Sequence, residues 1–173
     1  MISINGKKPQ IGKDCFIAPS ADLIGDVTIG DGSSIWFQCV LRGDVTPILI
    51  GKNTNIQDGT VIHGTYGKWD VKVGDNVTVG HKVMLHGCHI GDEAFVGMGS
   101  ILLDGSRMES QSFLAAGSLL TEGAVAESGW LYMGRPAKQV RKLKEEELKF
   151  LRQSANNYLM YKSWYDLPLK ERG

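Results

Sequence analysis

IGDEAFVGMGSILLDGSRM, residues 90–108, carries a large apolar side chain at every sixth position, and glycine follows the first two of them directly. A six-residue period matches no helix face, because a helix repeats every 3.6 residues. Isoleucine and valine favour strands, while Gly-Asp steps favour turns. The stretch therefore predicts short strands that alternate with tight turns.

The same six-residue period extends in both directions from this segment. The anchors of the repeat are Ile11, Ile17, Leu23, Ile29, Ile35, Leu41, Ile50, Ile56, Ile62, Val73, Val79, Leu85, Ile90, Val96, Leu102, Met108, Leu114 and Leu120. Such regularity argues against the alternative, an ordinary sandwich of short strands. It resembles the hexapeptide-repeat proteins, in which three hexads form one triangular coil of a left-handed parallel β-helix. The resemblance implies a mainly β fold of about six coils, each of which buries its apolar face against its neighbours.

Two interruptions of the repeat predict loops on one edge of the solenoid. Nine positions separate Leu41 from Ile50 and eleven separate Ile62 from Val73, instead of six. We expect loops near residues 44–47 and 65–70, both at the end of a coil. Insertions on one edge of a solenoid often mark its binding face.

The pattern changes after about residue 137. Residues 138–152 place Val140, Leu143, Leu148 and Leu151 near helical spacing, and the segment continues to Pro168. It predicts an amphipathic helix. We expect two units, a β-helix domain over 1–137 and a C-terminal helix over 138–173 that packs along the solenoid.

Composition excludes several classes of protein. Lys plus Arg and Asp plus Glu both number 19, a balance that argues against a general nucleic-acid binder. No apolar run approaches the roughly 20 residues needed to cross a membrane, and the N-terminus lacks the apolar stretch of a signal peptide. We therefore expect a cytoplasmic protein with no membrane partner. The three cysteines, Cys15, Cys39 and Cys88, form no CxxC pair, so a disulfide framework is not expected.

All four histidines fall between residues 63 and 89. His63 and His86 each follow an anchor directly, Ile62 and Leu85, in the third hexad of consecutive coils. They should stack on one edge, with backbones roughly 5 Å apart, which is close enough to share a metal ion. The alternative is that they are turn residues whose side chains cap backbone groups.

His81 stands two residues after the anchor Val79, in the second hexad, and points from a different side of the coil. A neighbouring subunit can supply it to the other two if a three-fold axis brings these sides together. Three imidazoles and one open position make a catalytic zinc site, and such a metal supplies hydroxide near pH 7. His89 has no stacking partner in this register and is interpreted as a surface residue.

The register places further polar groups around these histidines. Arg42 lies in the column below His63, Asp44 follows two positions later, and Gln57 precedes Asp58, which occupies the His81 position one coil below. A carboxylate there could orient an imidazole by accepting its free N–H. A structural Arg–Asp ion pair between coils or subunits is the alternative.

Several motifs carry a further resemblance: Arg42-Gly43-Asp44, Asn55-Ile56-Gln57-Asp58-Gly59, His63, Gly80-His81-Lys82-Val83-Met84-Leu85-His86-Gly87-Cys88, the run 96–105 and Ser154-Ala155-Asn156-Asn157-Tyr158. They resemble the γ-class carbonic anhydrases, in their small bacterial YrdA-type branch. The resemblance covers nearly the whole chain. It implies a homotrimer with zinc (ferrous iron also suits three imidazoles) at each interface, bound by His63 and His86 of one chain and His81 of the next. It assigns Arg42, Asp44, Gln57 and Asp58 to active-site and interface positions, for the hydration of CO2 to bicarbonate.

The sequence also departs from the most active enzymes of that class. Val45 replaces a glutamate, and the loop 64–70 is short and has no glutamate to carry protons away. The expected activity is therefore weak, and Tyr158 is a further group that can approach the metal from the C-terminal helix. Two alternatives remain open: acyl transfer to or from coenzyme A, and a non-catalytic metal-binding trimer.

Overall fold

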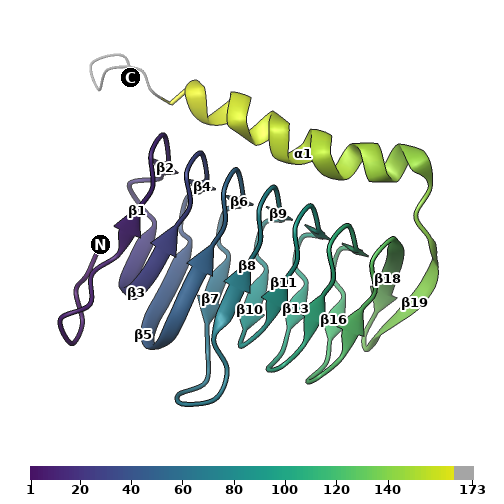
Figure 1. Ribbon diagram of the computed structural model, residues 1–173, viewed down its shortest axis with the longest axis horizontal. Coiled ribbons are helices and arrows are strands. Elements are labelled where there is room, and N and C mark those ends of the chain that lie inside the picture. Colours follow the sequence, from purple (N-terminus) through teal and green to yellow (C-terminus); the bar gives the residue numbers. More distant parts are fainter. Residues whose placement is uncertain (166–173) are drawn as a thin grey trace.

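A computed structural model describes residues 1–165 of the 173-residue chain. It is a parallel β-solenoid with one C-terminal helix (Figure 1). The strands are β1 (Gln10–Ile11), β2 (Phe16–Ile17), β3 (Asp22–Ile29), β4 (Ser34–Ile35), β5 (Val40–Ile50), β6 (Asn55–Ile56), β7 (Val61–His63), β8 (Val71–Val73), β9 (Thr78–Val79), β10 (Met84–His86), β11 (His89–Ile90), β12 (Phe95–Val96), β13 (Ile101–Leu102), β14 (Arg107–Met108), β15 (Phe113–Leu114), β16 (Leu119–Leu120), β17 (Val125–Ala126), β18 (Trp130–Gly134) and β19 (Ala137–Lys142). The helix α1 spans Glu145–Ser163.

The hexad anchors form the interior, as the sequence predicted. In one column, Leu41 pairs with Ile62, Ile62 with Leu85, and Leu85 with Leu102, all through parallel strands. Each of these four side chains is 0% exposed. Burial of one such aliphatic side chain contributes about 1.5–3 kcal/mol, so the stacked anchors account for the regular solenoid.

The solenoid has about seven turns, which corrects the six predicted from the anchors. Seven strands of the 8-stranded sheet, from β2 to β18, follow one another through parallel pairs. The additional turn continues the period through Ala126 and Tyr132, whose side chains are 0% and 7% exposed. They were missed because neither is a large aliphatic residue, although both face the interior. The fold agrees with the left-handed β-helix that the resemblance to hexapeptide-repeat proteins implied.

Only one of the two predicted loops exists. Residues 44–47 lie inside the strand β5, where the pairing with β3 shifts between Gly25 and Val27, so the extra residues form a bulge in a continuous ladder. Residues 64–70 do leave the solenoid, as a turn closed by an antiparallel bridge between Thr65 and Trp69. The two insertions lie on the same edge, because the Thr46 hydroxyl donates a hydrogen bond to the Trp69 carbonyl at 3.3 Å.

The predicted start of the C-terminal helix was wrong. Residues 138–142 belong to β19, which pairs antiparallel with β18, and α1 begins only at Glu145. Val140 is 48% exposed, so it does not belong to an apolar helix face. The helix begins where the Glu147 carboxylate accepts a hydrogen bond from the Lys144 N–H at 2.8 Å, a capping arrangement that satisfies a free backbone donor.

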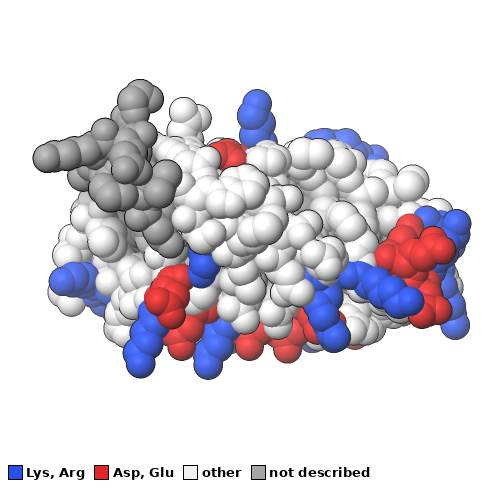
Figure 2. Space-filling model, turned by 90° about the horizontal axis from the view of Figure 1, so that it is seen from above, with Lys and Arg blue, Asp and Glu red and all other residues white. Residues whose placement is uncertain are grey.

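From β19 the chain turns back, and α1 runs along the solenoid towards its N-terminal end, while the loop between β7 and β8 projects from the other side (Figure 1). The buried residues of α1 are Leu151, Ser154 and Ala155. Seen from the side of α1, the middle of the molecular surface is largely uncharged, and most basic and acidic side chains gather along the lower edge and at the right-hand end, with a few at the upper edge (Figure 2). Within residues 1–165, no helix is long and apolar enough to cross a membrane. Pro168, the predicted limit of the helix, lies outside the described residues.

Candidate metal centre

His63 and His86 lie side by side at the ends of β7 and β10. The two residues are direct partners in the parallel ladder, as their equal distance from an anchor predicted. The His63 Nδ1 atom is 3.3 Å from the His86 Nε2 atom. Both rings are partly buried beside the 64–70 loop.

The other ring nitrogen of each imidazole is hydrogen-bonded to a carboxylate. His63 Nε2 is 3.0 Å from Asp44 Oδ1, and His86 Nδ1 is 2.7 Å from Asp104 Oδ1. Burial favours a higher pKa for Asp44, but hydrogen bonds from Arg42 (2.5 Å) and His63 outweigh it and lower that pKa. Burial likewise favours a higher pKa for Asp104, which hydrogen bonds from Thr65 and His86 lower.

The carboxylates determine which ring nitrogens are free. An ionised carboxylate can only accept hydrogen bonds, so His63 Nε2 and His86 Nδ1 carry the hydrogens in the neutral rings. The facing atoms, His63 Nδ1 and His86 Nε2, are then both lone-pair donors. Two nitrogens bound at 2.0–2.1 Å to one tetrahedral zinc ion lie about 3.3 Å apart, so the pair fits two ligands of such an ion.

One chain does not assemble a complete ligand set. Within residues 1–165, no group of three or more His, Cys, Asp and Glu side chains is placed to hold a metal ion. The third candidate, His81, follows β9 in the other sheet. Its Nδ1 atom lies 2.8 Å from Asp58 Oδ2, the carboxylate that the register placed one coil below it.

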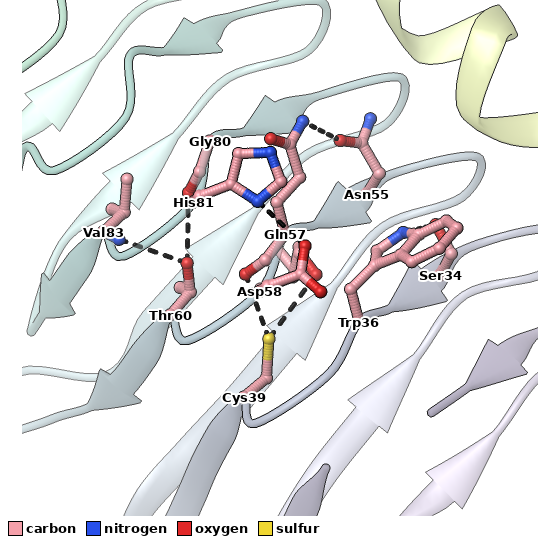
Figure 3. Close-up of polar contacts among 11 residues, drawn as sticks. Ser34, Trp36, Cys39, Asn55, Gln57, Asp58, Thr60, Gly80, His81 and Val83 are labelled. Carbon is pink, nitrogen blue, oxygen red and sulfur yellow. Dashed lines mark hydrogen bonds and ion pairs between the residues drawn. The ribbon is translucent and has the colours of Figure 1, made fainter. Parts of the chain in front are cut away.

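The turn that carries His81 is held from inside the solenoid (Figure 3). The buried Thr60 hydroxyl donates to the Gly80 carbonyl at 3.1 Å and accepts from the Val83 N–H at 3.2 Å. Gly80 is needed here because a Cβ atom would lie 2.7 Å from the Met98 backbone nitrogen. The position of His81 is therefore fixed by backbone packing as well as by Asp58.

A hydrogen-bond chain orients the Gln57 amide. Asn55 Nδ2 donates to the Val77 carbonyl at 3.3 Å and to the Thr78 hydroxyl at 3.0 Å, and Thr78 donates to Ser154 of α1. Since a backbone carbonyl only accepts, Asn55 Oδ1 remains to accept from Gln57 Nε2, at 3.0 Å. The Gln57 carbonyl oxygen is then the amide atom on the His81 side (Figure 3).

A cavity of about 410 Å³ opens beside Gln57 and His81, between α1 and the solenoid. Its walls are largely apolar and are formed by Phe95, Met98, Phe113, Ala116, Phe150, Tyr158 and Tyr161 among others. Burial, and then the nearby Asp58 charge, raise the pKa of Tyr158 to about 12. Its phenol therefore keeps its proton at neutral pH and can donate a hydrogen bond.

The structure brings the predicted residues together in two groups. Arg42 and Asp44 accompany the His63–His86 pair, whereas Gln57, Asp58 and Tyr158 surround His81. Sequence reasoning missed the contact of Asp104 with His86. Its signal was available, because Asp104 stands two positions after the anchor Leu102, one coil beyond His86.

His89 is more than the surface residue that was predicted. Its Nε2 atom lies 2.6 Å from Asp70 Oδ1, and its side chain is 39% exposed. Lys72 also contacts Asp70, at 3.0 Å. His89 thus holds the end of the 64–70 loop against β11.

Comparison with known proteins agrees with the fold and the motifs. Residues 8–43 and 70–104 match the family model described as bacterial transferase hexapeptide (six repeats). Protein YrdA of Escherichia coli (strain K12) is 53% identical over 163 residues, which cover 91% of this chain and 89% of that protein. Gamma carbonic anhydrase 2, mitochondrial, of Arabidopsis thaliana is 50% identical over 164 residues, 92% of this chain. The chain spans only 59% of the length of that plant relative.

A solved structure shows the same architecture. It is that of a hexapeptide transferase family protein from Anaplasma phagocytophilum, with a TM-score of 0.91 and 49% identity, covering 95% of this chain and 96% of that one. The six-residue repeat, the two corners of the solenoid that carry the His63–His86 pair and His81, and these relatives agree on the family. The chain belongs to the hexapeptide-repeat family and, within it, to the group whose members include gamma carbonic anhydrases and YrdA.

Proposed function

We propose that the protein is a weak, metal-dependent carbonic anhydrase that hydrates CO2 to bicarbonate. The observation that carries the proposal is the His63–His86 pair, whose facing nitrogens lie 3.3 Å apart while carboxylates occupy the outer nitrogens. We infer that His81 of a neighbouring subunit completes the ligand set in a homotrimer. Zinc suits three imidazoles, and ferrous iron is the other candidate.

The chain's own residues have separate tasks in this mechanism. When bound, the metal supplies hydroxide by lowering the pKa of water to about 7. Asp44 and Asp104 hold the two imidazoles in the tautomer that leaves the facing nitrogens free. The Gln57 carbonyl oxygen, which Asn55 leaves free, would accept a hydrogen bond and so orient the attacking group towards the carbon atom of CO2. The Tyr158 phenol donates a hydrogen bond to the product.

Proton export explains why we expect weak activity. Asp70 is the only acidic residue in the 64–70 loop, and His89 and Lys72 already engage it. Burial favours a higher pKa for Asp70, but these hydrogen bonds lower it. A carboxylate with a lowered pKa and two partners is a poor proton carrier near pH 7. Val45 removes the other acidic position.

Acyl transfer to or from coenzyme A is the second candidate. The cavity of about 410 Å³ beside His81 is far larger than CO2 requires, and the Anaplasma relative is named as a hexapeptide transferase family protein. In that reaction one histidine, His81, would act as general base, and Asp58 would orient it. No metal would be needed.

One experiment separates these candidates. We expect the protein loaded with zinc, or with ferrous iron under anaerobic conditions, to hold about one metal per chain and to hydrate CO2 in stopped-flow measurements. His86→Ala should lose most of the metal and the activity, whereas the control Tyr66→Ala, which changes an 81% exposed side chain of the neighbouring loop, should retain both. Metal uptake without hydration would favour the non-catalytic trimer. Activity towards acetyl coenzyme A that survives in His86→Ala and is lost in His81→Ala would favour acyl transfer. Failure of the wild-type protein to take up either zinc or ferrous iron would refute the proposal of a metal-dependent carbonic anhydrase.

A further inference from the structure

The 64–70 loop contacts the carboxylate that orients His86. The Thr65 hydroxyl donates to Asp104 Oδ2 at 2.5 Å, while Asp104 Oδ1 is engaged by His86 Nδ1 at 2.7 Å. The Thr65 N–H donates to the Trp69 carbonyl at 2.9 Å, which closes the loop on itself. Thr65 is therefore held in place by the loop rather than by the solenoid.

Trp69 packs into a gap left by two glycines of the same corner. A Cβ atom on Gly87 would lie 2.7 Å from the Trp69 Cβ and 2.3 Å from Asp104 Oδ1. A Cβ atom on Gly105 would lie 3.0 Å from the indole ring. The glycines that flank His86 and Asp104 thus allow both the indole and the carboxylate to approach this closely.

The two carboxylates of the metal centre are supported differently. Asp44 is held by Arg42, which precedes it on the same strand. Asp104 is held by the neutral hydroxyl of Thr65, a loop residue that lies 39 residues earlier in the sequence. Because the hydroxyl occupies one carboxylate oxygen, the other oxygen stays in line with the His86 ring.

We propose that Thr65 and Asp104 are positioning residues for His86, and that the 64–70 loop acts as a latch that fixes the ring and tautomer of this imidazole. The inference rests on the proposed metal site. It assigns a role to the loop other than proton transfer: the loop sets the affinity for the metal by keeping the His86 Nε2 lone pair directed at His63. Outer carboxylate partners of this kind typically change metal affinity about 10- to 100-fold.

The test compares metal affinity in matched variants of the full-length protein, using zinc in competition with a chromogenic chelator. We expect Asp104→Ala to weaken zinc binding about 10- to 100-fold and Asp104→Asn to weaken it less. Thr65→Val should weaken it roughly 3- to 10-fold, and Thr65→Ser, which keeps the hydroxyl, should restore it. Tyr66→Ala is the control, because Tyr66 lies in the same loop but its side chain is 81% exposed.

Nitrogen-15 NMR of the metal-free protein gives a readout that does not depend on metal uptake. At pH 8.5 the His86 ring of the wild type should carry its hydrogen on Nδ1, and Asp104→Ala should lose that preference. Wild-type zinc affinity in Asp104→Ala, or an equal loss in Tyr66→Ala and Thr65→Val, would overturn the role of the loop while leaving the proposed function intact. If the wild type binds no metal, but its His86 ring prefers the hydrogen on Nδ1 and Asp104→Ala loses that preference, the proposed function fails and the positioning of His86 stands.

Discussion

The two histidine-bearing corners of the solenoid are built in different ways. The His63–His86 corner is formed by residues one coil apart and is covered by an inserted loop. The His81 corner is formed by one turn, is held from within by Thr60, and is covered by α1. One corner offers a pair of facing nitrogens and the other offers a single imidazole beside a cavity. This difference is what the proposed site requires, in which each corner supplies half of the ligands.

The largest predicted effect is the recovery of metal binding in mixed trimers, which tests whether the two corners meet at a subunit interface. We expect His63→Ala chains and His81→Ala chains each to lose tightly bound metal. In random equal mixtures, an interface is wild type when an intact His63–His86 corner meets an intact His81, so about a quarter of the sites should return. Metal analysis after co-refolding measures this.

The control for that mixture is His63→Ala with His86→Ala. These residues share one corner, so no mixture of the two variants rebuilds it. No recovery in the first mixture, with mixed trimers demonstrated by mass spectrometry, would show that the corners do not meet across an interface.

Added buffer should raise the rate of CO2 hydration, because the 64–70 loop beside the His63–His86 corner offers no proton carrier. We expect imidazole to raise the CO2 hydration rate of the wild type roughly tenfold, because a mobile base replaces the absent glutamates. Stopped-flow rates across an imidazole series measure it. Rates that are already high and independent of buffer would mean that another group exports the proton.

Thr60→Val tests the support of the other corner. The substitution leaves the buried Val83 N–H without its partner, so we expect a loss of about 1–3 kcal/mol in the free energy of unfolding. Urea denaturation measures this, and Thr60→Ser is the control because it keeps the hydroxyl. A neutral Thr60→Val variant would show that the His81 turn does not need this contact.

The smallest predicted effect is a partial loss of the helix α1, which covers the His81 corner, at acid pH. Hydrogen bonds from Arg141 and from the Lys144 N–H lower the pKa of Glu147 to about 2, from 4.5. Because the folded-state pKa is depressed, this stabilisation is complete above pH 4.5 and is lost as the pH falls towards 2.

Circular dichroism between pH 5 and pH 2 should therefore show partial loss of α1 signal in the wild type. Glu147→Gln should lose this pH-dependent step, and Glu145→Gln, which removes an exposed pair with Lys149, should keep it. Identical acid profiles for wild type and Glu147→Gln would contradict the assignment.

The sequence predicted features that follow from register and missed those that depend on folding between coils. The period located the interior and the stacking of His63 on His86, because strand pairing preserves register. It did not locate the contact between Thr65 and Asp104, which requires an inserted loop to fold back on a later coil. It also extended the helix to residue 138, since apolar spacing alone does not distinguish an edge strand such as β19 from the first turns of a helix.

The hairpin of β18 and β19 also has a consequence for how these molecules behave at high concentration. A bare end of a parallel ladder offers unpaired backbone groups to another copy, which invites end-to-end polymerisation. Here β19 pairs with β18 in the opposite direction and carries Lys138, Arg141 and Lys142. Reversed pairing at this end of the 8-stranded sheet, together with the charges of Lys138 and Lys142, disfavours the growth of a fibre from β19.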